Sequence, residues 1–126
     1  MTPGVHRLIV AGGRDFACYA SLSLVLNTFY ATLLADGKQL EVVCGGARGA
    51  DSLGERWATQ FSVPVVRMPA DWNTHGKSAG YKRNAQMAEV GHELVAFWDG
   101  KSKGTGHMID LARAKGLPIT VVGYKI

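Results

Sequence analysis

The sequence is poor in cysteine, in charged residues and in long apolar runs. Its two cysteines, Cys18 and Cys44, each stand alone in an apolar context, without the spacing that a disulfide framework or a structural zinc site needs. The first apolar run, residues 8–11, meets glycine at once and is too short for a signal-peptide core or a membrane span. We therefore expect a cytoplasmic protein with no membrane partner and no metal.

What the chain does contain is enough apolar material for one core. It has 126 residues, of which 47% are hydrophobic, and a chain of this size buries about two thirds of its unfolded surface. No linker or change in composition divides it, so residues 1–126 are expected to form a single domain. Fourteen Lys and Arg against ten Asp and Glu give a net charge of +4, which is compatible with an anionic partner but does not require one.

Five short runs rich in β-branched residues are typical of strands covered on both faces. Stretches with helical spacing of apolar residues separate them. Because parallel strands need right-handed crossovers, this alternation predicts an α/β fold, a single Rossmann-like doubly wound parallel sheet of about five strands with flanking helices, in the order 3-2-1-4-5. The expected strands are 7–11, 40–44, 63–67, 93–97 and 118–122, and the expected helices are 19–35, 50–61, 79–90 and 106–115.

Two of the expected helices carry further predictions. The first is apolar over a broad arc, with Leu24, Phe29, Tyr30 and Leu33 available for contact with a second copy of the chain, so a homo-oligomer is plausible. In the second, Trp57 lies on the apolar stripe and is expected in the core.

Three glycine-rich turns follow the first, second and fourth expected strands, at 12–16, 45–51 and 98–107, and each carries an arginine or a lysine. The carboxyl ends of parallel strands share one edge of the sheet, where ligands bind. Glycine allows backbone N–H groups to approach an anion closely, and a neighbouring cation adds charge-assisted donors. A reading as plain tight turns explains the glycines but not the repeated cations. The pattern therefore favours a phosphate site.

The segment after the third expected strand, 68–84, is a long polar loop that enters a basic helix start. Long loops of this kind are common at functional sites. Lys77 and Arg83 are placed to close over a phosphate, whereas Trp72 suits either stacking on a base or capping the core. Trp98, at the end of a strand, is equally open to a site role or a core role.

Four aspartates lie in the loops. Asp15 and Asp51 suit either helix capping or recognition of a ribose hydroxyl, and Asp71 and Asp99 are candidates for contact with sugar hydroxyls. His107 has no carboxylate at a fixed local spacing that would make it a catalytic base.

Taken in order, these motifs resemble the YspA/YpsA-related branch of the SLOG (SMF/DprA-LOG) superfamily, over residues 5 to 123. The resemblance implies a Rossmann-like sheet with a site for nucleotides or nucleotide-derived ligands, and it supplies no settled reaction for this branch. The motifs that carry it are GGRDF at 12–16, VCGGARGAD at 43–51, PADW at 69–72, GYKRNAQM at 80–87, FWDG at 97–100 and GTG at 104–106.

Resemblance to two groups within that superfamily implies different functions for the same loops. Residues 45–51 and 82–84 look like the glycine-arginine turn and the basic helix start of Smf proteins, which bind single-stranded DNA. In LONELY GUY phosphoribohydrolases, a glycine-threonine turn leads into a catalytic glutamate, assisted by an arginine on the preceding helix. Here Arg83 fits the arginine, but residues 104–110 contain no glutamate, so Asp110 or a carboxylate from another loop would have to substitute.

Our leading hypothesis is therefore a nucleotide-binding sensor or sequestering module for a small phosphorylated ligand such as a nucleotide, an ADP-ribose-like molecule or a signalling nucleotide. The alternatives are a nucleotide N-glycosidic hydrolase, with Arg83 and Asp99 as candidate catalytic residues, and single-stranded nucleic acid binding through exposed Arg and Lys. No cofactor is certain. The predicted ligand-binding residues are Gly12, Gly13, Arg14, Asp15, Gly45, Gly46, Arg48, Gly49, Asp51, Asp71, Trp72, Lys77, Arg83, Asn84, Asp99, Gly104, Thr105 and Gly106.

Overall fold

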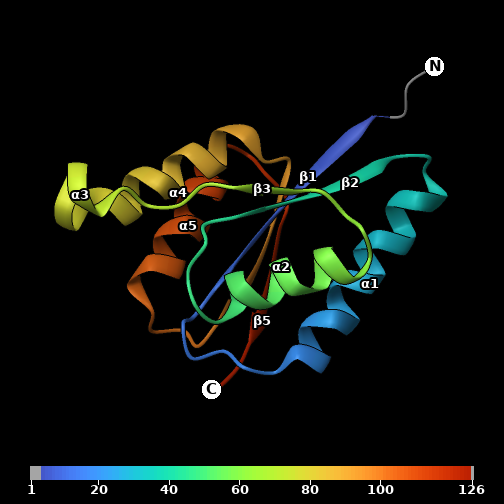
Figure 1. The fold of residues 1–126 in the computed structure, drawn as a ribbon, viewed down its shortest axis with the longest axis horizontal. Coiled ribbons are helices and arrows are strands. Elements are labelled where there is room, and N and C mark those ends of the chain that lie inside the picture. The colour runs from blue at the N-terminus through green and yellow to red at the C-terminus, as the bar shows by residue number, and fades with distance from the viewer. Residues whose placement is uncertain (1–3, 126) are drawn as a thin grey trace.

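The computed structural model describes residues 4–125 and contains one parallel sheet (Figure 1). The strand order is β3-β2-β1-β4-β5, which confirms the predicted fold class and order. The strands are β1 (Val5–Gly12), β2 (Gln39–Cys44), β3 (Val65–Arg67), β4 (Glu93–Trp98) and β5 (Ile119–Gly123), and the helices are α1 (Tyr19–Ala35), α2 (Ala50–Gln60), α3 (Trp72–His75), the short 3-10 helix η1 (Gly76–Ser78), α4 (Ala79–Val90) and α5 (Lys103–Ala114).

Helices cover both faces of this sheet. Side chains of α1 and α2 pack with one apolar cluster of the strands, and those of α4 and α5 pack with a second cluster on the opposite face. The alternation of side chains along β1 shows the division, because Leu8 and Val10 join the first cluster whereas Ile9 and Ala11 join the second. Coverage on both faces explains why the strands read as continuous apolar runs.

The central strands place the turns that form the candidate site. β1 pairs with β4 from Leu8 opposite Glu93 to Gly12 opposite Phe97, so both strands end at the same edge.

Trp57 is completely buried, as expected, and its indole N–H donates to the Asn27 side-chain oxygen at 3.0 Å. Within residues 4–125, no helix has the length and apolar character needed to cross a membrane.

Three local predictions need correction. The last helix begins at Lys103 rather than at residue 106, because the Asp99 carboxylate accepts the N–H groups of Lys101 and Ser102 and ends the preceding turn early. The third strand is shorter than expected, and only Val65–Arg67 pairs with β2. Leu33, on the buried side of α1, is unavailable for contact with a second copy of the chain, whereas Leu24 of the same helix is 70% exposed.

Candidate functional site

A pocket of about 500 Å³ lies at the carboxyl edge of the sheet, between the turn after β1, the segment α3–η1–α4 and the start of α5. We call it the central pocket. It brings together eleven of the eighteen predicted site residues, from turns far apart in the sequence. Its lining residues are Ala11, Gly12, Gly13, Arg14, Asp15, Ala47, Asp51, Trp72, Lys77, Gly80, Tyr81, Arg83, Asn84, Met87, Ser102, Gly104, Thr105 and Met108.

The start of α5 presents unoccupied backbone donors to this pocket. Within the described residues, the N–H groups of Lys103, Gly104 and Thr105 have no hydrogen-bond partner, and the first N–H of the helix with one is that of Gly106, which donates to the Ser102 carbonyl at 3.1 Å. Gly104 and Thr105 line the pocket, and a Cβ on Gly104 would meet open space. Free N–H groups and the positive end of the helix dipole make such a terminus attractive to anions.

Three cationic side chains line the same pocket, and they differ in whether they are already hydrogen-bonded within the protein. Arg14 and Lys77 are exposed, and neither side chain forms an ion pair or hydrogen bond with any residue from 4 to 125. Arg83, in contrast, donates through Nη1 to the Gly45 carbonyl at 2.7 Å and through Nε to the Asn84 side-chain oxygen at 3.0 Å. Arg14 and Lys77 are therefore free to meet a ligand, while Arg83 also joins α4 to the turn after β2.

The turns after β1 and β2 use much of their hydrogen-bonding capacity internally. The Gly13 N–H donates to the Phe97 carbonyl at 3.1 Å, and the Gly13 carbonyl accepts the N–H groups of Phe16 and Ala50. The Gly49 backbone has φ of 78°, and a Cβ there would overlap the Gly13 carbonyl oxygen. These glycines therefore hold the two turns against each other, and the Gly13 N–H is not available to a ligand in this structure.

Asp51 lines the pocket from the first turn of α2. Its carboxylate is only 5% exposed and accepts the Gly45 N–H at 2.9 Å. Burial raises the pKa of this carboxyl to about 6, although the N–H groups of Gly45 and Ala47 and the charge of Arg83 oppose the rise. The bond to Gly45 fixes the turn after β2, so Asp51 does not cap α2.

Asn84 connects α4 to α5 behind the pocket. It is 6% exposed, and its side-chain amide donates to the Gly104 carbonyl at 3.2 Å and lies 3.3 Å from His107 Nδ1. Burial lowers the pKa of His107. The Asn84 contact therefore fixes the start of α5 relative to α4.

A smaller hollow of about 250 Å³ adjoins the central pocket. We call it the outer hollow. Predicted residues of the turn after β2 lie here rather than in the central pocket, and Arg48 is exposed at its rim. The lining residues of the outer hollow are Arg14, Gly45, Gly46, Ala47, Arg48, Pro69, Ala70, Trp72 and Arg83.

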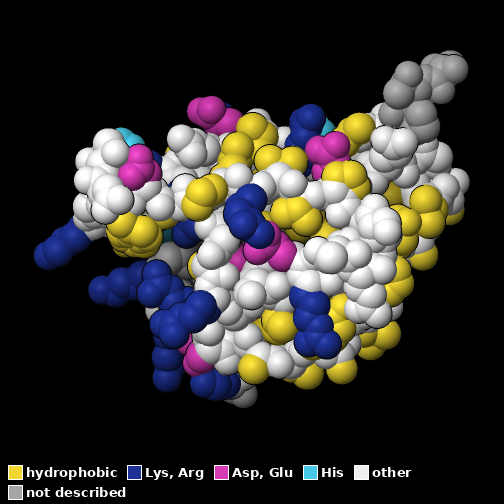
Figure 2. Space-filling model, in the orientation of Figure 1, with side chains coloured by type: hydrophobic (Ala, Val, Ile, Leu, Met, Phe, Trp, Pro, Cys, Tyr) yellow, Lys and Arg dark blue, Asp and Glu magenta, His cyan; other side chains and the backbone are white. Residues whose placement is uncertain are grey.

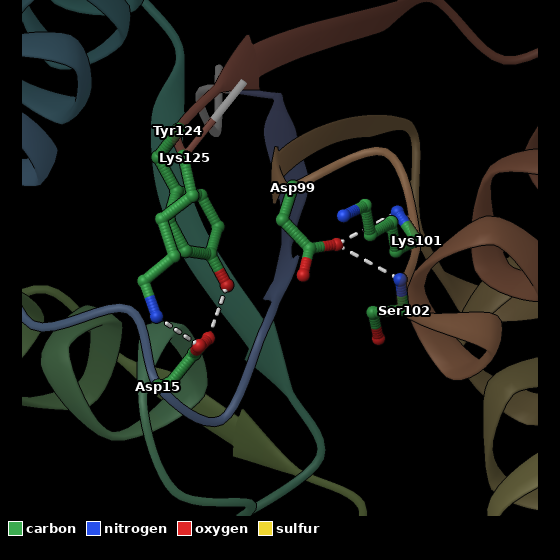
Figure 3. Close-up of polar contacts among 6 residues, drawn as sticks. All are labelled: Asp15, Asp99, Lys101, Ser102, Tyr124 and Lys125. Carbon is green, nitrogen blue, oxygen red and sulfur yellow. Dashed lines mark hydrogen bonds and ion pairs between the residues drawn. The ribbon is translucent and has the colours of Figure 1, made fainter.

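The remaining aspartates are occupied by the protein itself. Asp15 accepts the Tyr124 hydroxyl at 2.7 Å and the Lys125 ammonium at 2.5 Å (Figure 3), and these contacts lower its pKa. Asp99 accepts the N–H groups of Ser102 and Lys101, each at 2.8 Å, which lowers its pKa as well. Asp71 caps α3 by accepting the Thr74 N–H at 3.1 Å.

The structure does not bring every predicted residue to the central pocket. Asp71 and Asp99 do not line it, Gly49 supports the turns, and Gly106 lies against the Trp98 indole on the other side of α5. Trp72 is 52% exposed at the pocket rim, so it does not cap the core.

Sequence reasoning missed part of the lining. Ala11, Met87 and Met108 form apolar floor, and Tyr81, which is 46% exposed, forms part of the wall. Helical spacing offered one signal, because Tyr81 precedes the predicted site residue Asn84 by three positions in α4, and residues three apart lie on the same side of a helix. Ser102 gave no signal, since its place depends on where α5 begins.

A parallel five-stranded sheet with helices on both faces and a pocket at its carboxyl edge defines a Rossmann-like α/β protein. Residues 6–75 match the model of the YspA, cpYpsA-related SLOG family. The chain belongs to this family.

Two known proteins are similar over almost the whole chain. The Gene 61 protein of Mycobacterium phage D29 is 42% identical over 127 residues, which cover 96% of this chain and 99% of that protein. The X-ray structure of DNA processing protein A (DprA) from Streptococcus pneumoniae superposes with a TM-score of 0.71 at 15% identity and covers 98% of this chain. The chain spans about half (51%) of the length of that DprA chain, and the likeness shows a shared fold.

Proposed function

We propose that the central pocket binds a nucleotide or a nucleotide-derived phosphorylated ligand, and that the protein acts as a sensor or sequestering module for it. The observation that carries this proposal is the convergence of two cations, Arg14 and Lys77, with the N–H groups at the start of α5, none of which has a partner among residues 4–125. Family and fold fit a nucleotide- or nucleic acid-binding role in general.

The phosphate would lie at the start of α5. Gly104 leaves open space beside the helix terminus, so a phosphate oxygen can approach the N–H groups without meeting a side chain. Arg14 and Lys77 would add charge-assisted hydrogen bonds, and the Asp15 carboxylate opposes them little because Lys125 and Tyr124 already hold it.

The rest of the pocket suits the nucleoside part of such a ligand. Its volume of about 500 Å³ falls within the range of about 300–1,000 Å³ for small-molecule sites. Met87 and Met108 provide an apolar floor, and the exposed ring of Trp72 stands at the rim. Aromatic and apolar groups of this kind bind the faces of a base.

No specific contact favours cleavage of the N-glycosidic bond. A carboxylate that stabilises positive charge on the ribose must face the sugar, but Asp99 does not line the central pocket. The two carboxylates that do line it are already hydrogen-bonded, Asp15 to Tyr124 and Lys125 and Asp51 to the Gly45 N–H. We therefore propose binding as the function.

Isothermal titration calorimetry tests this proposal with a panel of nucleoside mono-, di- and triphosphates and ADP-ribose. Arg14→Gln and Lys77→Gln should each weaken binding about tenfold or more, because each removes a charge-assisted contact. Lys38→Gln is the matched control, since Lys38 precedes β2 at the opposite edge of the sheet. Failure of the whole panel to bind at millimolar concentration, or an equal effect of Lys77→Gln and Lys38→Gln, would overturn the proposal.

A further inference from the structure

The segment between β3 and α4 forms a wall of the central pocket but adds nothing to the core. Residues 71–78, which include α3 and η1, are all exposed, and the next residue, Ala79, is buried. Figure 1 draws α3 at the left end of the molecule, and Figure 2 shows the same segment as a lobe with a hollow between it and the dark blue side chains below. A segment without buried contacts moves at little cost in free energy.

The first part of this segment is held together by its own hydrogen bonds. Asp71 accepts the Thr74 N–H on its side chain at 3.1 Å and the His75 N–H on its carbonyl at 3.0 Å. Among residues 4–125, no side-chain hydrogen bond or ion pair joins residues 71–75 to β1, α2 or α5. These five residues can therefore move as one unit, and we call them the α3 arm.

The chain is fixed on both sides of the α3 arm. The Met68 N–H donates to the Cys44 carbonyl at 2.8 Å just after β3, and Ala79 is 1% exposed at the start of α4. Between the arm and Ala79 lies Gly76, with φ of 55° and no atom within 4 Å of the position that a Cβ would take. Glycine adopts such a backbone freely, and no neighbour opposes a change in its conformation. Gly76 is therefore suited to act as a hinge.

Two side-chain contacts cross this hinge. The Ser78 hydroxyl donates to the His75 carbonyl at 2.9 Å, and Lys82 Nζ lies 3.3 Å from His75 Nδ1. All three residues are exposed, so water can replace both contacts with little net loss of free energy. The contacts keep the α3 arm in its present position without locking it there.

Trp72 is the side chain that the α3 arm carries to the pocket. It is 52% exposed at the rim, and no other residue of the arm lines the central pocket. Its ring lies beside Gly80, where a Cβ would be 3.6 Å from the ring. Because Gly80 presents no side chain, the ring can slide over the start of α4 toward the pocket.

We propose that the α3 arm is a lid, which turns about Gly76 and lays the Trp72 ring over the base of a nucleotide held in the central pocket. This inference rests on the proposed function, because it adds a closing step to the same pocket. More than half of the Trp72 surface is exposed in the present structure (52%). Closing buries that surface against the base, and the burial and stacking of the two rings drive the movement.

Hydrogen–deuterium exchange tests the closing step in the unmodified protein. It is measured with ADP, GDP, CDP, UDP and ADP-ribose, each at saturation, and with inorganic pyrophosphate, which has no base. With the nucleotide that binds most tightly, the backbone amides of residues 71–76 should exchange about fivefold more slowly than without ligand. Pyrophosphate should change the same exchange by less than about twofold, and the amides of β4 are the internal reference.

Gly76→Ala tests the hinge, with affinities measured by calorimetry. Alanine allows fewer backbone conformations than glycine. The arm therefore reaches its closed position less often, and affinity for the same nucleotide should fall about fivefold while affinity for pyrophosphate stays within about twofold. Gly116→Ala is the matched control, because Gly116 has φ of 74° with equally open surroundings but follows α5, away from the pocket.

The outcomes separate this inference from the proposed function. Nucleotide binding without slower exchange in residues 71–76, or with equal effects of Gly76→Ala and Gly116→Ala on affinity, would overturn the lid and leave the proposed function standing. Equal protection of residues 71–76 by pyrophosphate and by the nucleotide would overturn the lid too, because Trp72 would then have no base to cover. No binding of any of these nucleotides would remove both.

Discussion

Two glycine-rich turns of this protein have similar sequences but differ in what their backbones do. In the turn from β2 to α2, the Gly45 N–H donates to Asp51 and the space beside the Gly45 α-carbon is filled by the Arg83 guanidinium. In the turn from β4 to α5, the N–H groups of Gly104 and its two neighbours remain without partners in the described part of the chain, and the space beside Gly104 is open.

The position of the acidic residue accounts for this difference. Asp51 lies after its turn, inside the helix, and its buried carboxylate reaches back to the beginning of the turn. Asp99 lies before its turn and satisfies only the N–H groups of Lys101 and Ser102, which precede the helix. The two acids therefore hold different backbone donors: Asp51 accepts the N–H at the beginning of its turn, whereas Asp99 accepts two N–H groups at the end of its turn.

Substitution of Gly49 should give the largest effect on stability. Gly49→Ala places a Cβ on a backbone with φ of 78° and against the Gly13 carbonyl, so we expect a loss of about 3–4 kcal/mol in the free energy of unfolding. Urea unfolding of the variant and the original protein measures this loss. Gly37→Ala is the control, because Gly37 has φ of 70° with open space around it and should lose only about 1 kcal/mol. Equal losses of unfolding free energy in the two variants would show that the contact between Gly49 and the Gly13 carbonyl leaves no less room than the open space around Gly37.

Asp51→Asn should change how stability depends on pH. Because the pKa of Asp51 is raised to about 6 in the folded protein, the native state binds this proton more tightly than the unfolded chain, and ionisation costs stability as pH rises from about 4 to about 7. Asparagine does not ionise and still accepts the Gly45 N–H. The stability of the variant relative to the original should therefore improve over that range by on the order of 2–3 kcal/mol. Thermal unfolding at matched pH values measures it, and a constant difference between the two proteins would contradict it.

The regular elements could be predicted from the sequence because their signals are local. The β-branched run at 93–97 is a buried strand, and α1 has the bounds that its apolar spacing predicts. The strand order followed from the alternation of strands and helices, together with the handedness of crossovers. The start of α5 was predicted three residues late, because glycine and threonine at 104–106 look like a turn until the bonds made by Asp99 are known.

The candidate site was harder to predict, because it depends on contacts between distant segments. The engagement of the Gly13 N–H by Phe97 is set by the pairing of β1 with β4, and nothing near Gly13 in the sequence indicates it. Arg83 looked like a free phosphate ligand, yet it holds the Gly45 carbonyl. Residue type therefore predicted a site at the edge of the sheet where the central pocket lies, while the tertiary contacts determine which donors are free.

Gly104→Ala tests the difference between the two turns, and it is the variant expected to change the fold least. A methyl group at Gly104 meets no atom within 4 Å, and replacing glycine by alanine in a helix stabilises it by up to about 1 kcal/mol. The same methyl would stand beside the free N–H groups, so nucleotide affinity should fall while the melting temperature rises slightly. Gly106→Ala is the matched variant, because its Cβ would lie 3.3 Å from the Trp98 ring, outside the central pocket, and should leave mononucleotide affinity unchanged. If Gly104→Ala binds nucleotides as tightly as the original protein, the ligand does not approach the start of α5, and the difference between the two turns concerns folding alone.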